Sequence, residues 1–134
     1  MKRTAKTLIV DDSVPILLLM EKFLNLHGIF DVTTASDGVR GLELFERETL
    51  GETPYSLVFL DVVMPGMDGL ETLKWMRAME TNSGITRDRE ATIIMISGVN
   101  SETINVTENS YSYYLAKPLN MHELQATLAR YDFL

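Results

Sequence analysis

Residues 7–12 read Thr-Leu-Ile-Val-Asp-Asp, a short apolar run that ends in two adjacent carboxylates, Asp11 and Asp12. A second run of this kind, residues 56–60, ends at Asp61. Short apolar runs that stop at polar residues are typical of strands buried in a parallel sheet. If the two strands lie side by side, their carboxyl ends bring all three acids to one edge of the sheet.

Three carboxylates held this close raise one another's pKa values and resist joint ionisation unless a cation neutralises them. Carboxylate oxygens are hard ligands that suit Mg²⁺ or Mn²⁺. The sequence therefore predicts a divalent-metal site formed by Asp11, Asp12 and Asp61, with one carboxylate free to do chemistry.

Outward from these two runs, strand-like and helix-like segments alternate along the chain. Strands are predicted over residues 7–10, 30–35, 56–60, 91–96 and 112–116. Helices are predicted over residues 14–27, 38–50, 70–80, 101–109 and 120–130, the fourth short or irregular because it is rich in Asn, Thr and Ser. Five strands interleaved with five helices predict an α/β fold, a doubly wound parallel sheet that forms one domain over residues 1–134.

Ligands of such sheets bind beyond the carboxyl ends of the strands. Ser97 and Lys117 also follow predicted strands, which places them around the same crevice as the three acids. An aspartate is a known nucleophile in phosphoryl transfer, and the transferred group needs its oxygens neutralised by a metal ion, a cation and a hydroxyl. This chain offers Asp61 as acceptor, Ser97 as hydroxyl donor and Lys117 as cation.

Composition excludes several other classes of protein. The chain has 134 residues, no cysteine and a formal net charge of −7, which argues against disulfide or thiol chemistry and against general binding of nucleic acid. No apolar run approaches the ~18 residues of a membrane span, and the basic N-terminus is not followed by a signal-peptide core. A cytoplasmic protein with no membrane partner is expected.

Four motifs resemble the response-regulator receiver family of two-component signalling, and together they cover nearly the whole chain in order. They are residues 8–12 (LIVDD), 60–69 (LDVVMPGMDG), 96–98 (ISG) and 114–119 (YLAKPL). The resemblance implies the flavodoxin-like fold with strand order 2-1-3-4-5 and phosphorylation of Asp61 by a histidine kinase or histidine phosphotransfer protein. It also implies Mg²⁺ bound by Asp12, Asp61 and the backbone carbonyl of Val63, with Asp11 acting through water.

The same resemblance implies a cis Lys117–Pro118 bond that aims the lysine, and a conformational switch formed by Ser97 and Tyr114. Tyr114 has an alternative interpretation, simple packing in an edge strand. Residues 110–113 read Ser-Tyr-Ser-Tyr where the family usually shows Gly-Ala and an acid, so inherited expectations about the output face are weakest there.

Two functions from different classes follow from this resemblance. The favoured one is a phospho-accepting receiver that is not an enzyme beyond assisting its own phosphorylation and dephosphorylation. Since the sequence extends little past the last predicted helix, it is expected to act alone, by binding an unknown downstream protein or by relaying phosphate. The rival is a receiver-shaped interaction module that is never phosphorylated. A phosphoester hydrolase is disfavoured, because Val63, two residues after Asp61, is no general acid or base.

A partner surface is predicted on the first helix. Helical spacing predicts a core-facing stripe of Ile16, Leu19, Met20 and Phe23. Leu17 and Leu18 are out of phase with that stripe, and with Pro15 they would form an apolar patch near Asp61 that holds a histidine-bearing donor. The alternative is a broad apolar face that neighbouring elements cover, so the hypothesis requires Leu17 or Leu18 to be exposed.

Overall fold

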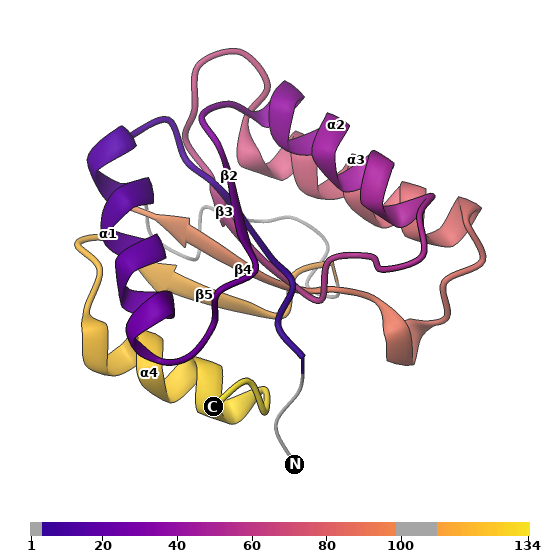
Figure 1. Cartoon of the computed structure of the whole chain (residues 1–134). Coiled ribbons are helices and arrows are strands. Elements are labelled where there is room, and N and C mark those ends of the chain that lie inside the picture. Colours follow the sequence, from indigo (N-terminus) through magenta and orange to yellow (C-terminus); the bar gives the residue numbers. More distant parts are fainter. Residues whose placement is uncertain (1–3, 99–109) are drawn as a thin grey trace.

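The computed structural model describes residues 4–98 and 110–134. Its centre is a five-stranded parallel sheet in the order β2-β1-β3-β4-β5, with helices on both faces (Figure 1). The strands are β1 Thr7–Val10, β2 Val32–Ala35, β3 Leu57–Asp61, β4 Thr92–Ser97 and β5 Tyr113–Ala116. The α-helices are α1 Val14–Leu26, α2 Gly38–Thr49, α3 Gly69–Asn82 and α4 Met121–Arg130. The predicted doubly wound, flavodoxin-like fold and its strand order are confirmed, and the helix predicted over residues 101–109 lies outside the described residues.

Alternation along the central strands creates two separate layers of core. In β3, Val58 and Leu60 pack with α2 and α3, whereas Leu57 and Phe59 pack with α1 and α4. Figure 1 shows the same division, with α2 and α3 together on one face and α1 and α4 on the other. Because both faces are covered, β3 is apolar from Leu57 to Leu60, which is the pattern seen in the sequence.

The buried stripe of α1 differs from the predicted one. Leu17 is buried with Met20 and Phe23, whereas Leu19, predicted in the core, is 49% exposed. Residues 16–20 are all apolar, so helical spacing in this segment fits more than one stripe. The docking of α1 on the sheet decides which stripe is buried.

Between α3 and β4, residues 83–90 are largely exposed and contain a short 3₁₀-helix, Arg87–Arg89. Across the described part of the chain, no helix combines the length and the apolar character that a membrane crossing requires.

Candidate functional site

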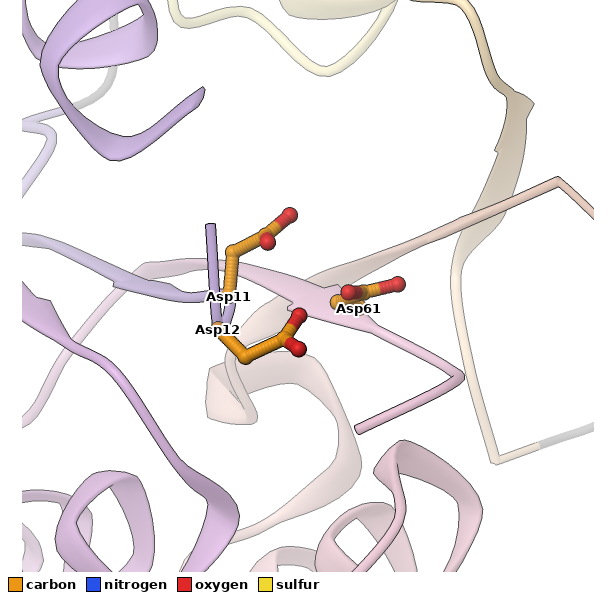
Figure 2. Close-up of side chains that lie close together, drawn as sticks. All are labelled: Asp11, Asp12 and Asp61. Carbon is orange, nitrogen blue, oxygen red and sulfur yellow. The ribbon is translucent and has the colours of Figure 1, made fainter. Parts of the chain in front are cut away.

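The register of the sheet brings the predicted acids together. Val10 of β1 lies opposite Leu60 of β3, so the residues that follow, Asp11 and Asp61, leave the sheet side by side. One carboxylate oxygen from each of Asp11, Asp12 and Asp61 lies within 4.8 Å of the other two. Figure 2 shows the three side chains gathered at the ends of the two strands.

The acids differ in burial and in hydrogen bonding. Asp11 and Asp61 are 1% and 2% exposed, whereas Asp12 is exposed to solvent. Asp11 Oδ1 accepts a hydrogen bond of 2.8 Å from the backbone N–H of Ser13, the residue that precedes α1. Asp11 Oδ2 is buried and makes no hydrogen bond to the described residues. This oxygen therefore keeps its capacity to accept a cationic ligand.

Lys117 brings one positive charge to these carboxylates. Its Nζ donates to Asp61 Oδ2 at 3.2 Å and lies 3.5 Å from Asp11 Oδ2. Its backbone N–H donates to the carbonyl of Ser97 at 2.9 Å, and the Lys117–Pro118 bond is cis, as the family resemblance implied. The lysine is thus held by the pairing of β4 and β5 and points to the ends of β1 and β3.

Charge in the cluster is incompletely balanced, and the pKa values show it. Burial, followed by repulsion from Asp11 and more weakly from Asp12, raises the pKa of Asp61 to about 6, although attraction to Lys117 opposes the shift. Burial alone would lower the pKa of Lys117, but attraction to Asp61 and Asp11 outweighs it and raises that pKa. One lysine does not neutralise three acids, so a further cation would stabilise the site.

The two residues of the predicted switch lie on neighbouring strands. Ser97 is the last residue of β4 and is fully buried, one residue beyond the partner of Asp61 in the sheet. The hydroxyl of Tyr114, on β5, donates to the carbonyl of Ser97 at 3.2 Å. Tyr114 is half-buried and also packs against the core on the α2 and α3 side, so it combines the packing contact and the contact with Ser97.

The loop after Asp61 is tied closely to the strand it leaves. Val63 lies in this loop with its side chain 62% exposed. The N–H of Gly69, the first residue of α3, donates to the carbonyl of Val62 at 2.8 Å. A Cβ at position 69 would overlap the backbone carbonyl of Asp61, so only glycine fits there. Sequence reasoning assigned Gly69 no role beyond its motif, although a glycine that opens a helix is a signal of close backbone approach.

The three residues of the predicted partner surface do not lie together. Pro15 is exposed and Leu18 is 62% exposed, which meets the requirement that one of the two leucines be accessible. Leu17 is only 6% exposed and packs against the sheet, so its assignment to the surface was wrong. The accessible apolar residue beside Leu18 is Leu19 instead.

The donor set at this edge fits a divalent cation. Three carboxylates supply oxygen ligands of the kind that Mg²⁺ prefers, and the buried oxygen of Asp11 has no hydrogen bond that a metal ion would have to replace. Within the described residues, Asp11, Asp12 and Asp61 could therefore hold such an ion.

Comparison with known proteins agrees with this geometry. The family model described as the response regulator receiver domain matches residues 7–129. The chain belongs to the response regulator receiver domain family. Receiver domains are signalling modules of two-component systems rather than classical enzymes, and they work with histidine kinases or phosphotransfer proteins.

Two solved structures of receiver-type proteins are similar over almost the whole chain. Chemotaxis protein CheY4 of Vibrio cholerae is 28% identical with a TM-score of 0.75, covering 96% of this chain and 98% of that one. Response regulator TrrA of Thermotoga maritima, solved in complex with Mg²⁺ and BeF, is 28% identical with a TM-score of 0.74, covering 97% and 98%.

Curated relatives of this receiver domain are longer proteins. The probable transcriptional regulator ycf27 of Guillardia theta is 33% identical over 125 residues, which are 92% of this chain and 43% of that protein. The transcriptional regulatory protein CpxR of Escherichia coli K12 is 32% identical over 125 residues, 92% of this chain and 47% of that protein. The chain spans less than half the length of these two relatives.

Proposed function

We propose that this chain is a phospho-accepting receiver in which Asp61 takes a phosphoryl group from a phosphohistidine. One observation carries the proposal: Asp61 is buried between two further carboxylates and the Nζ of Lys117, 3.2 Å away, at the carboxyl edge of the sheet. Burial of an acid beside this surplus of negative charge destabilises the folded protein, unless the site binds a cation and then an anionic group.

In the proposed reaction, a carboxylate oxygen of Asp61 attacks phosphorus. The new P–O bond forms as the P–N bond to the donor histidine breaks, and the electron pair of that bond stays on the histidine nitrogen. The attacking oxygen must be ionised, which the adjacent ammonium group of Lys117 favours. Lys117 then has a phosphoryl oxygen to pair with, and the hydroxyl of Ser97 donates to another.

Mg²⁺, or Mn²⁺ in its place, would be held by Asp11, Asp12, Asp61 and the backbone carbonyl of Val63. When bound, it neutralises charge on the carboxylates and on the phosphoryl oxygens. We further propose that the contact between Tyr114 and the carbonyl of Ser97 changes on phosphorylation and alters binding of a downstream protein. Residues 1–134 would form one receiver domain that acts in the cytoplasm without binding nucleic acid.

The direct test is incubation of the chain with Mg²⁺ and acetyl phosphate, followed by intact mass measurement. We expect one phosphoryl group that is labile to hydroxylamine, lost in Asp61→Asn and in the presence of a chelator. Asp12→Asn should fold normally and be phosphorylated very slowly. Asp88→Asn, which alters an exposed acid at the other end of the sheet, should be labelled like the wild type. Absence of labelling in the wild type would favour the unphosphorylated interaction module.

Docking of the donor is proposed at the end of α1 nearest the site, through Pro15 and Leu18. Leu18→Asp should slow phosphoryl transfer from a phosphorylated histidine phosphotransfer protein and leave labelling by acetyl phosphate unchanged, because the small donor needs no docking. Leu26→Asp is the matched control, since Leu26 is 75% exposed at the far end of the same helix. Equal slowing by the two variants would show that docking does not depend on the end near Asp61.

The lifetime of the phosphoryl group is proposed to be long for the family. The exposed side chain of Val63 is apolar and cannot orient a water molecule for attack on the phosphoryl group. Val99, to which the same reasoning applies, lies outside the described residues. Val63→Asn should therefore speed the decay of phosphorylated protein, and an unchanged decay rate would reject the idea.

A further inference from the structure

The surface between α2 and α3 contains three hollows that share residues and so form one groove. Their volumes are about 160, 230 and 470 Å³. Glu46 and Met79 line the first two, and Met67 with Val39 lines the first and third. We call this the α2–α3 groove. It runs from the loop before α3, at residues 65–67, to the far end of α3 at Ser83.

Apolar side chains that water reaches line much of this groove. Val39 is 52% exposed and Leu50 is 73% exposed. Leu42, Met67 and Met79 are half-buried beside them. Accessible apolar residues that follow one groove are typical of surfaces that bind another protein segment, and methionine adapts readily to different partners.

Negative charge accompanies these apolar residues. Asp37, Glu43 and Glu46 line the groove, against one cation, Arg40. Arg40 pairs with Glu43 at 3.2 Å, so Glu46, in the middle of the groove, has no ion pair with that arginine. Asp37, at the end near residues 65–67, caps α2 by accepting from the N–H of Arg40 at 2.7 Å but forms no ion pair with its guanidinium group. The whole chain carries a net charge of −7, which further favours a cationic partner.

The groove is separate from the proposed phosphodonor surface. Helices α2 and α3 cover one face of the sheet, and α1 covers the other (Figure 1). A segment bound in the groove would leave Leu18 accessible, because Leu18 lies on the other face of the sheet. One end of the groove, at residues 65–67, lies in the loop that follows Asp61.

We propose that the α2–α3 groove binds an amphipathic, basic segment of a partner protein. The apolar side of the segment contacts Val39, Met67 and Met79, and its lysine or arginine side chains pair with Glu46 and Asp37. This is the helix-in-groove mode of peptide recognition, with charge setting the preference for the partner.

The test uses a synthetic amphipathic peptide of leucine and lysine, with a leucine and glutamate peptide of the same pattern as its counterpart. Methyl NMR of the protein's methionines reports the location of binding. We expect the lysine peptide to shift Met67 and Met79, while the fully buried Met20 and Met76 stay unchanged. The glutamate peptide should shift neither.

Two variants separate a specific groove from general attraction of opposite charges. Glu46→Lys should weaken binding of the lysine peptide about fivefold, the effect of one partly exposed ion pair. Glu123→Lys makes the same charge change on α4, on the other face of the sheet, and should weaken it less than twofold, as screened distant charges do. Val39→Asn, which leaves the charge unchanged, should also weaken binding.

Three results would overturn the proposal. The first is equal weakening by Glu46→Lys and Glu123→Lys, which would indicate unspecific attraction. The second is a lysine peptide that leaves Met67 and Met79 unshifted, whether it binds elsewhere or not at all. The third is a shift of Met67 and Met79 on concentrating the protein alone, with dimers seen by sedimentation, which would make a second copy the occupant.

Discussion

Buried carboxylates lie at both ends of the sheet, but they are paired to different degrees. At the amino end of β4, Glu80 of α3 receives a 2.7 Å hydrogen bond on each oxygen, from Arg77 Nη1 and from the backbone N–H of Ala91. At the carboxyl edge, Asp11 Oδ2 has no hydrogen bond, and Asp11 and Asp61 share the single ammonium group of Lys117. Burial raises the pKa of Glu80 and of Asp61 alike, so burial by itself does not distinguish them.

The number of hydrogen-bond partners distinguishes a structural charge from a ligand site in this protein. Arg77 also donates to the carbonyls of Ala91 and Ser110, so this ion pair fastens α3 to the segments before β4 and β5. Each carboxylate oxygen of Glu80 accepts a hydrogen bond from inside the protein, so this acid does not depend on a ligand. The acids at the carboxyl edge have too few hydrogen-bond and ion-pair partners, and an added cation would neutralise their remaining charge.

The largest effect on stability is expected from a substitution that breaks the ion pair between Arg77 and Glu80. Arg77→Met leaves Glu80 buried without its cation and should lower the free energy of unfolding by about 3 kcal/mol at neutral pH, measured in urea. Arg40→Met is the matched control, because Arg40 and Glu43 are 55% and 60% exposed and such pairs contribute within about 0.5 kcal/mol. Similar losses in the two variants would mean that the cluster around Glu80 is not a structural clamp.

Removal of a negative charge from the acids at the carboxyl edge should stabilise the protein, the opposite of the effect of Arg77→Met. In a metal-free buffer at pH 7.5, Asp61→Asn should raise the free energy of unfolding by about 2–3 kcal/mol, given about 1.4 kcal/mol per unit of pKa shift. Because the folded protein raises the pKa of Asp61 from 3.8 to about 6, wild-type stability falls as pH rises through that window. The advantage of the variant should therefore vanish near pH 4, and an advantage of equal size at both pH values would contradict the assignment.

Mg²⁺ should reduce the difference in stability between the wild type and Asp61→Asn. At an ion concentration ten times its dissociation constant, it should stabilise the wild type by about 1.4 kcal/mol. Asp12→Asn should lose most of this gain, whereas Glu80→Gln, altered at the other end of the sheet, should keep it. Thermal unfolding with and without the ion measures the effect, and the idea fails if Asp12→Asn gains as much as the wild type.

The smallest effects concern the helix starts near the site. Asp68 caps α3 by accepting from the N–H of Glu71 at 2.9 Å, so Asp68→Ala should cost about 1 kcal/mol in urea unfolding. Ser13 precedes α1, but its side chain makes no capping bond, and its backbone N–H donates to Asp11 Oδ1. Ser13→Ala should change stability by less than about 0.5 kcal/mol, and a larger loss would show that the serine side chain caps α1 in solution.

Much of the site could be predicted because its residues mark the ends of strands. The sequence placed Asp11, Asp61, Ser97 and Lys117 each directly after an apolar run, and parallel pairing then brings them to one edge. No comparable sequence pattern predicted the ion pair between Arg77 and Glu80. An arginine and a glutamate three residues apart on a helix are usually solvated, and only the fold puts the N–H of Ala91 against Glu80.

The alternation of strands and helices along the chain and the acids at the sheet edge were determined by the sequence alone, because they follow from local runs of apolar residues and the points at which these stop. The buried stripe of α1, the fit of Gly69 against Asp61 and the burial of Asp11 Oδ2 without a hydrogen bond were decided only by the tertiary structure. Each depends on how closely segments far apart in the chain approach one another, and a pattern of neighbouring residues carries no measure of that distance.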